Sequence, residues 1–293
     1  MAIPEDQLTT WANQGATTMS ADTYRSVETA LARHTWPQSM SYEVYLQGSY
    51  ANATNIRADS DIDVICEFTS QFDSNLTPID KQQLGLIAGT YPVQRFNSEV
   101  LHALVAHFGR GSITRGNKSI KIGAQPGRLK ADVIPCIKYC HYNGLKLEAE
   151  GVKFRGQSDE LEYEAYPKAH RDNGANKNSP LRTNGWYKPT VRIFKNMRNR
   201  ASDINVTFFT TKIPSYFVEC LLFNVPDGQF GASYESTVIH AINFLHHSLQ
   251  GPAAQNFTFQ HGRWALFGDH RYQLTVSQAR SFTSELIELW NGW

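Results

Sequence analysis

The run LQGSYANATNIRADSDIDVICEF at residues 46–68 constrains the fold and the chemistry of this chain most strongly. Its apolar residues alternate at the spacing of a half-buried strand: Ile62, Val64, Cys66 and Phe68. The residues between them face the other way, so Asp61 and Asp63 are predicted to share the opposite face of that strand. A Gly48-Ser49 dipeptide stands upstream, directly after another predicted strand.

Two carboxylates on one strand face favour a cation site. Residues two apart on a strand lie roughly 7 Å apart at their Cα atoms, and like charges that close repel each other unless a positive charge lies between them. A pair of Mg²⁺ ions about 4 Å apart supplies that charge in phosphoryl and nucleotidyl transfer. A solvated strand face is the alternative, and for an isolated D-x-D it is the better interpretation. Asp59 is expected in the turn before the strand, not at the metals.

A third aspartate changes this balance. Residues 119–122 and 129–134 alternate around the turn AQPG and are predicted to form a hairpin. Ala131 and Val133 face one side of the second strand, which leaves Asp132 on the other side. A surface charge explains Asp132 alone, but a Gly-Ser turn, D-x-D and a later strand aspartate together indicate catalytic carboxylates. The glycine backbone and the serine hydroxyl of the turn suit a phosphate group.

Composition limits the partners. The 28 Lys and Arg residues balance 27 Asp and Glu residues at a net charge of +1, so a long nucleic-acid activator is not expected. The four cysteines are expected to be reduced thiols of a cytoplasmic protein. Cys136, Cys140 and His141 lack a second pair at zinc spacing, so no zinc is expected. The longest apolar run, near residues 216–225, is about half a membrane span, so no membrane partner is expected.

The order of elements predicts an α+β chain with two lobes. Besides the aspartate strand, strands are expected at residues 41–47, 119–122 and 129–134, and helices at 7–33, 93–108, 186–200, 214–224, 234–250 and 276–290. The polar, turn-rich stretch 151–180 is expected to be the crossover between the lobes. Residues 1–160 are therefore expected to form a mixed α/β lobe with an N-terminal helix, and residues 161–293 a helical lobe.

Two helices of the second lobe carry residues of the types that bind phosphates and nucleotide bases. On the helix at 186–200, Arg192 and Lys195 lie off the predicted apolar stripe and are candidates to hold a triphosphate; a solvated basic face is the alternative. Pro214 is expected in the first turn of the next helix. Ser215 and Tyr216 then stand at its exposed start, where a hydroxyl suits phosphate and a ring suits a base. A core aromatic is the alternative for Tyr216.

Four segments together resemble the cGAS/DncV-like nucleotidyltransferases, a bacterial branch of the DNA polymerase β-like superfamily: QGSYANATNIRADSDIDV, KADVIP, RIFKNMR and PSYFVE. The resemblance spans residues 41–224. It implies a two-lobed fold with a mixed β-sheet catalytic lobe, a helical second lobe and the active site in the cleft between them. It also implies nucleoside triphosphates, ATP included, as substrates and two Mg²⁺ ions as cofactors, with Mn²⁺ as the substitute ion.

The resemblance also implies roles for residues of the first lobe. Gln47, Gly48 and Ser49 would contact the donor triphosphate. Asp61 and Asp63 would bind both metals. Asp132 would bind the catalytic metal and help to deprotonate the attacking hydroxyl.

In the second lobe, Lys195 and Ser215 match the family's triphosphate contacts, and Tyr216 matches its base-stacking aromatic residue. His170 and Asn173 lie where related bacterial enzymes place groups near the bases, and an asparagine suits a uracil or adenine edge.

The resemblance implies a bacterial, cytoplasmic enzyme of antiphage signalling. It would join nucleoside triphosphates into a cyclic dinucleotide or oligonucleotide second messenger, release pyrophosphate, and leave a separate effector protein to bind the product. A linear oligonucleotide synthase or a nucleotidylating transferase on the same fold is one alternative. A non-catalytic nucleotide sensor is the other.

Overall fold

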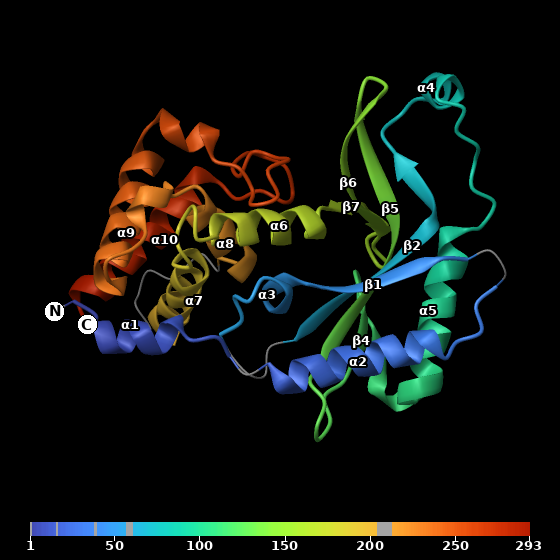
Figure 1. Ribbon diagram of the computed structural model, residues 1–293, viewed down its shortest axis with the longest axis horizontal. Coiled ribbons are helices and arrows are strands. Elements are labelled where there is room, and N and C mark those ends of the chain that lie inside the picture. The colour runs from blue at the N-terminus through green and yellow to red at the C-terminus, as the bar shows by residue number, and fades with distance from the viewer. Residues whose placement is uncertain (1, 16, 38–39, 57–60, 204–212) are drawn as a thin grey trace. The chain divides into compact units, whose positions relative to one another are not determined.

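The computed structural model describes residues 2–15, 17–37, 40–56, 61–203 and 213–293 (Figure 1). They form two compact units. The sheet unit comprises the described residues within 16–50 and 58–168, and the helical unit those within 1–15, 51–57 and 169–293. The main division thus falls at 168/169, where the sequence predicted 160/161, and the first helix belongs to the helical unit.

Seven strands of the described chain form one mixed sheet in the order β1-β2-β5-β4-β3, with β6 between β5 and β7. Their bounds are β1 Tyr42–Gln47, β2 Ile62–Ser74, β3 Ile113–Arg115, β4 Ile120–Ile122, β5 Ala131–Asn143, β6 Lys146–Arg155 and β7 Glu162–Ala165. The central pair, β2 and β5, is parallel, and the other pairs are antiparallel. The two aspartate-bearing strands are therefore direct neighbours.

The helices are α1 Glu5–Ala12, α2 Thr18–Ala32, α3 Gly48–Ala51, α4 Pro78–Gln83, α5 Val93–Phe108, α6 Pro167–Lys177, α7 Tyr187–Asp203, α8 Ser215–Phe223, α9 Tyr234–Gln250 and α10 Val276–Asn291. Short 3₁₀ turns lie at Arg110–Ser112, Asp227–Gln229 and Pro252–Asn256. The fold is α+β, as the sequence predicted. In the described part of the chain, no helix is long and apolar enough to span a membrane.

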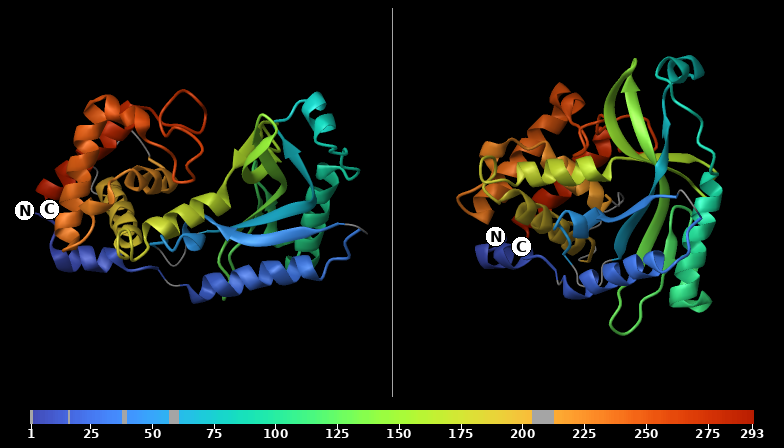
Figure 2. Two further views of the ribbon diagram at one scale, coloured as in Figure 1. Left: turned by 45° about the horizontal axis from the view of Figure 1, so that its top comes forward. Right: turned by 45° about the vertical axis from the view of Figure 1, so that its right-hand side comes forward.

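One face of the sheet is covered by α2 and α5 (Figures 1 and 2). The alternating residues of β2 and β5 are buried there: Ile62, Val64, Cys66, Phe68, Ala131 and Val133. On the opposite face Ile65, Ile134, Cys136 and Val152 form a smaller cluster. The alternation read from the sequence is thus confirmed, and it directs Asp63 and Asp132 away from the helix-covered core.

The predicted helix at 7–33 is wrong, because it is two helices, α1 and α2. The backbone leaves the helix after α1, and the Gly15 amide donates a hydrogen bond to the Asn55 carbonyl at 3.0 Å. The two helices serve different cores, since Leu8 packs in the helical unit and Val27 in the sheet unit. In one continuous helix, Leu8 and Val27 would not both reach their cores.

The predicted crossover at 151–180 contains the division between the two units, and it also contains regular structure that the sequence did not indicate. Strand β6 runs through its beginning, and β7 and α6 follow. These elements bury few side chains: Val152 in β6, Tyr163 in β7, and His170, Gly174 and Lys177 in α6. Their buried apolar residues are therefore too few to form the periodic pattern that predicts a helix or a strand.

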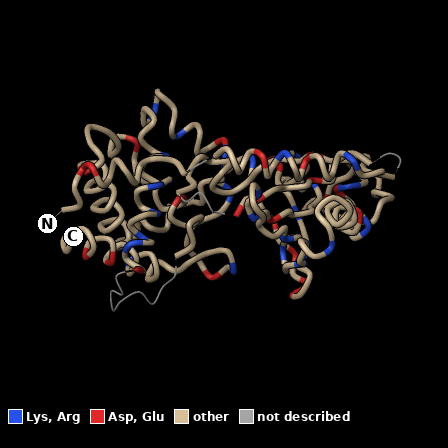
Figure 3. The backbone as a smooth tube through the Cα atoms, turned by 90° about the horizontal axis from the view of Figure 1, so that it is seen from below, with Lys and Arg blue, Asp and Glu red and all other residues tan. Residues whose placement is uncertain are grey.

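The core of the helical unit lies between α1, α7, α8, α9 and α10. Helix α7 is buried on almost every side, which the predicted stripe of 186–200 did not anticipate. All four cysteines are free and buried, in agreement with the prediction of reduced thiols. Lys and Arg are interspersed with Asp and Glu along the described backbone (Figure 3).

Candidate active site

Four polar residues lie in one row across four neighbouring strands of the sheet unit. The register pairs Gln47 of β1 with Asp63 of β2, Asp63 with Asp132 of β5, and Asp132 with Lys121 of β4. Residues paired in register project from the same face of a sheet. The row therefore places two carboxylates side by side on the face that α2 and α5 do not cover.

The environment makes the negative charge of Asp63 costly. Burial raises the pKa of its carboxyl to about 7, with further contributions from the charges of Asp132 and Asp61, while Lys121 lowers it. The Lys121 Nζ lies 3.7 Å from Asp132 Oδ2, and the Asp132 side chain is 22% exposed. One lysine does not balance the carboxylates, so the row attracts a further cation.

Gly48, the first residue of α3, lies against the Asp63 carboxylate. Its φ is +69°, and a Cβ at this position would collide with Asp63 Oδ2. Both the backbone conformation and the space thus require glycine. The tight turn of Gly48 and Ser49 follows β1 directly, as predicted. Ser49 is thus two residues along the chain from Gln47, the residue of the row that lies on β1.

The carboxylates suit Mg²⁺ by their chemistry, although they do not form a complete cage. Among the described residues, no three His, Cys, Asp or Glu side chains are grouped as a metal centre. Mg²⁺ usually binds one or two protein carboxylates and takes its other ligands from water and substrate phosphates. Burial, and then the charges of Asp132 and Asp61, raise the pKa of Asp63, so a cation bound here would favour its ionised form. Asp61 is exposed and directly precedes β2, and Asp59 lies outside the described residues.

In the helical unit, Lys195 is almost fully buried and its ammonium group is fully engaged. Its Nζ donates to the Thr54 carbonyl at 3.1 Å, to Thr54 Oγ1 at 3.0 Å and to Glu219 Oε1 at 2.5 Å. A lysine has three N–H donors, so binding a phosphate requires at least one of these contacts to be exchanged. The triphosphate role of Lys195 stays a prediction.

Arg192 and Ser215 also have partners within the helical unit. The Arg192 side chain is buried and donates from Nε to the Ala12 carbonyl and from Nη1 to the Ala53 carbonyl, each at 2.5 Å. Ser215 Oγ accepts a hydrogen bond from Arg198 Nη1 at 2.8 Å. The nucleotide-binding roles of both residues stay predictions, and the contacts of Arg192 give it a structural role in joining chain segments.

Tyr216 retains a ring surface open to solvent. It is 43% exposed and stacks on His170 with ring centroids 4.8 Å apart. His170 in turn shares a hydrogen bond from Nε2 with Glu219 Oε2 at 3.1 Å. Asn173 Nδ2 donates to the Gln260 carbonyl at 2.8 Å. The exposed tyrosine suits a base-stacking role, which stays a prediction.

The sequence did not identify two charged residues that contact the predicted site residues, namely Glu219 beside Lys195 and Lys121 beside Asp132. Glu219 accepts from Lys195, Thr54 and His170, and it is the one carboxylate in the apolar run 216–225. Lys121 stands opposite Asp132 in the predicted hairpin. A lone charge within an apolar helix, and a charge facing an aspartate across a hairpin, were the available signals.

Comparisons with known proteins give a consistent result. Residues 172–291 match the model of the cGAS/DncV-like nucleotidyltransferase C-terminal helical domain. A cyclic UMP-AMP synthase of Rhodothermus marinus is 40% identical over 297 residues, covering 100% of this chain and 99% of the relative. The cyclic nucleotide synthase CdnE01 of Staphylococcus haemolyticus is 32% identical, covering 100% of each chain.

Solved structures agree in fold. The Rhodothermus marinus CdnE c-UMP-AMP synthase with Apcpp and Upnpp superposes with a TM-score of 0.91 at 40% identity, covering 99% of this chain and 97% of that one. The Elizabethkingia meningoseptica CdnE cyclic dinucleotide synthase with GTP and Apcpp has a TM-score of 0.79 at 27% identity, covering 99% and 100%.

Proposed function

We propose residue roles and substrates for this chain from the premise that it belongs to the cGAS/DncV-like nucleotidyltransferases. It is a cyclic dinucleotide synthase of the CdnE family, and nucleoside triphosphates are its substrates. The family generally uses divalent metal ions. The observation that carries the residue assignment is the in-register pair Asp63 and Asp132; burial, and then the charge of Asp132, raise the pKa of the Asp63 carboxyl.

We propose that Asp61, Asp63 and Asp132 hold two Mg²⁺ ions, with Mn²⁺ as the substitute. When bound, such ions lower the pKa of an attacking ribose hydroxyl and neutralise charge on the leaving pyrophosphate. Asp132 then accepts the proton of the hydroxyl or orients the group that does so. The Lys121 Nζ, 3.7 Å from Asp132 Oδ2, helps to orient this carboxylate.

The turn after β1 would hold the donor triphosphate. Because Gly48 has no Cβ, its backbone lies against the Asp63 carboxylate and can approach a phosphate beside the metals closely. The Ser49 hydroxyl and the Gln47 amide donate hydrogen bonds to phosphate oxygens. Gln47 is in register with Asp63, so its amide starts from the same face of the sheet as the carboxylates.

The helical unit would supply contacts to the bases and to the triphosphate. The exposed ring of Tyr216, supported from behind by His170, stacks on a base. Asn173 contacts the edge of a uracil or adenine base. Lys195 and Ser215 bind triphosphate oxygens after exchanging Thr54 and Arg198 as partners, and Arg192 adds positive charge.

We propose uridine and adenosine triphosphates as the two substrates, because the Rhodothermus marinus relative, 40% identical over the full length, is a cyclic UMP-AMP synthase. Purified protein is incubated with Mg²⁺ and each pair of nucleoside triphosphates, and the phosphatase-treated products are identified by mass spectrometry. A ring has no terminal phosphate, so ATP with UTP should give one phosphatase-resistant product.

The matched control is the double variant Asp61→Ala with Asp63→Ala, which should form no product. Linear products would favour an oligonucleotide synthase, and label on a macromolecule would favour a nucleotidylating transferase. Binding of nucleotide without turnover would favour a sensor. Each of these outcomes contradicts the proposed synthesis.

We further propose that the product is a second messenger of antiphage defence in the bacterial cytoplasm, where a separate effector protein binds it. Expression of the genes for the chain and for its effector protein in a bacterial host should reduce phage plaque numbers. The same genes carrying the double aspartate variant should not protect, and equal protection would argue against a role for the product.

A further inference from the structure

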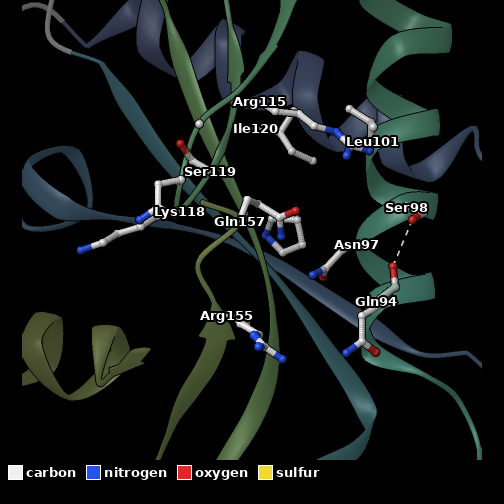
Figure 4. Close-up of a pocket in the computed structure, with 13 residues that line it drawn as sticks. Gln94, Asn97, Ser98, Leu101, Arg115, Lys118, Ser119, Ile120, Arg155 and Gln157 are labelled. Atoms are coloured by element: carbon white, nitrogen blue, oxygen red, sulfur yellow. Dashed lines mark hydrogen bonds between the residues drawn. The ribbon is translucent and has the colours of Figure 1, made fainter. Parts of the chain in front are cut away.

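A cavity of about 180 Å³ lies in the sheet unit, apart from the aspartate row (Figure 4). Leu101 of α5, Ile120 of β4 and Pro135 of β5 form the apolar part of its lining. Leu101 and Ile120 belong to the core that α2 and α5 cover. The next residue of β4, Lys121, is paired with Asp132 and so faces the other way. The cavity is therefore on the opposite side of the sheet from the catalytic carboxylates.

The charged groups around the cavity are cationic. Arg115, Lys118 and Arg155 line it, and no Asp or Glu does so. Lys118 places its Nζ 4.0 Å from the centre of the Tyr163 ring. Arg155 donates to exposed Glu160 at 3.1 Å, and Arg115 is exposed without a described hydrogen-bond or ion-pair partner. This lining suits an anion, and arginine guanidinium groups match the geometry of phosphate.

Amide side chains supply the second recognition element. Asn97 Oδ1 is buried and accepts no hydrogen bond from the described residues. A buried acceptor without a donor is uncommon in a folded protein. Gln94 and Gln157 add two more amides at the exposed part of the lining. In the view of Figure 4, Asn97 lies between Arg115 and Arg155.

We propose that this cavity binds a nucleoside 5′-monophosphate. A base offers N–H donors for Asn97 Oδ1, and asparagine and glutamine amides pair with base edges. The phosphate contacts Arg115 and Arg155. The cavity has room for several water molecules and so for the base, while ribose and phosphate extend over the exposed lining. A triphosphate would leave charge unmatched by two arginines.

The test is equilibrium dialysis of labelled AMP and UMP against the full chain, with a non-hydrolysable triphosphate analogue present in excess to fill the catalytic site. One monophosphate should bind per chain. Arg115→Ala should weaken binding at least about tenfold, since a charge-assisted hydrogen bond is lost, and Asn97→Ala should weaken it as well. Arg110→Ala is the matched control, because Arg110 is an exposed arginine of the same unit outside the cavity.

Arg115 lies outside the aspartate row, so Arg115→Ala should retain the circular-dichroism spectrum and the synthase rate of the wild type. Inorganic phosphate should displace AMP only weakly, because it has no base. The proposal is overturned if no monophosphate binds at millimolar concentration, if Arg115→Ala binds like the wild type, or if phosphate competes as well as AMP.

Discussion

The buried ion pair of Lys195 and Glu219 offers a quantitative test of the helical unit. Burial alone raises the pKa of the Glu219 carboxyl, but Lys195 and then His170 outweigh it and hold the pKa at about 2, against 4.5 for an ordinary glutamate. A shift of that size is worth about 3 kcal/mol at 1.36 kcal/mol per pKa unit. Substitution experiments on buried ion pairs in other proteins show that removing one partner costs about 3–5 kcal/mol of stability.

We therefore expect Lys195→Met to lower the free energy of unfolding by about 3–5 kcal/mol at pH 7, because Glu219 keeps its charge without its cation. Urea denaturation monitored by circular dichroism measures this loss. The folded pKa lies below the unfolded value, so the contribution of the pair is present above pH 4.5 and is lost as the pH falls through about 2.

The control is the double variant Lys195→Met with Glu219→Leu, which replaces the pair by apolar groups and should recover most of the stability. A loss below about 1 kcal/mol for Lys195→Met would place the pair in the range of an exposed ion pair. That result would refute the buried network. It would indicate that Lys195 is exposed to solvent and can bind phosphate without exchanging partners.

Three further perturbations have defined outcomes. Gly48→Ala should reduce the synthase rate at least about a hundredfold, because its Cβ displaces the Asp63 carboxylate. Gly109→Ala, at φ +79° and ψ 147° with no atom near a Cβ, should cost about 1–3 kcal/mol of backbone strain and leave the rate near that of the wild type. Glu285→Gln should stabilise the protein by up to about 3 kcal/mol above pH 7 and not at pH 4 in thermal unfolding. Burial, and then Glu288, raise the Glu285 pKa to about 7, so stability is lost as the pH rises from 4.5 to 7. Tyr216→Ala should raise KM about tenfold or more in steady-state kinetics through lost stacking, and Tyr216→Phe should not.

Each of these three predictions has a contrary result. Equal rates for Gly48→Ala and Gly109→Ala would separate Asp63 from catalysis. An unchanged pH profile for Glu285→Gln would show that solvent reaches that carboxylate in the folded chain. A KM for Tyr216→Ala equal to that of the wild type would remove the ring from nucleotide binding.

Local signals predicted much of the sheet unit. Pro92 and Gly109 bracket the helix expected at 93–108, and α5 has those bounds, with Gly109 at φ +79°. The alternation around Asp63 and Asp132 identified the strand faces correctly, because a period of two leaves no other choice for a half-buried strand. That the two strands are parallel neighbours depends on pairing over about 70 residues, which periodicity does not specify.

The helical unit was harder to predict in its polar details. Lys195 and Arg192 were expected off the apolar stripe of α7, but both are buried because backbone carbonyls of distant segments and Glu219 accept from them. A sequence reveals the residue types of such pairs but not their contacts. Helix α6 escaped prediction for the opposite reason, since it buries few side chains.

The most direct test of the central claim is the synthase rate of Asp132→Asn beside the wild type, measured with ATP, UTP and Mg²⁺ by quantifying the phosphatase-resistant product. Ser98→Ala, on α5 and outside the aspartate row, is the control for folding and should match the wild type. We expect Asp132→Asn to lose at least about a thousandfold in rate while still binding nucleotide. A rate within tenfold of the wild type would contradict the assignment of the carboxylate row as the catalytic centre.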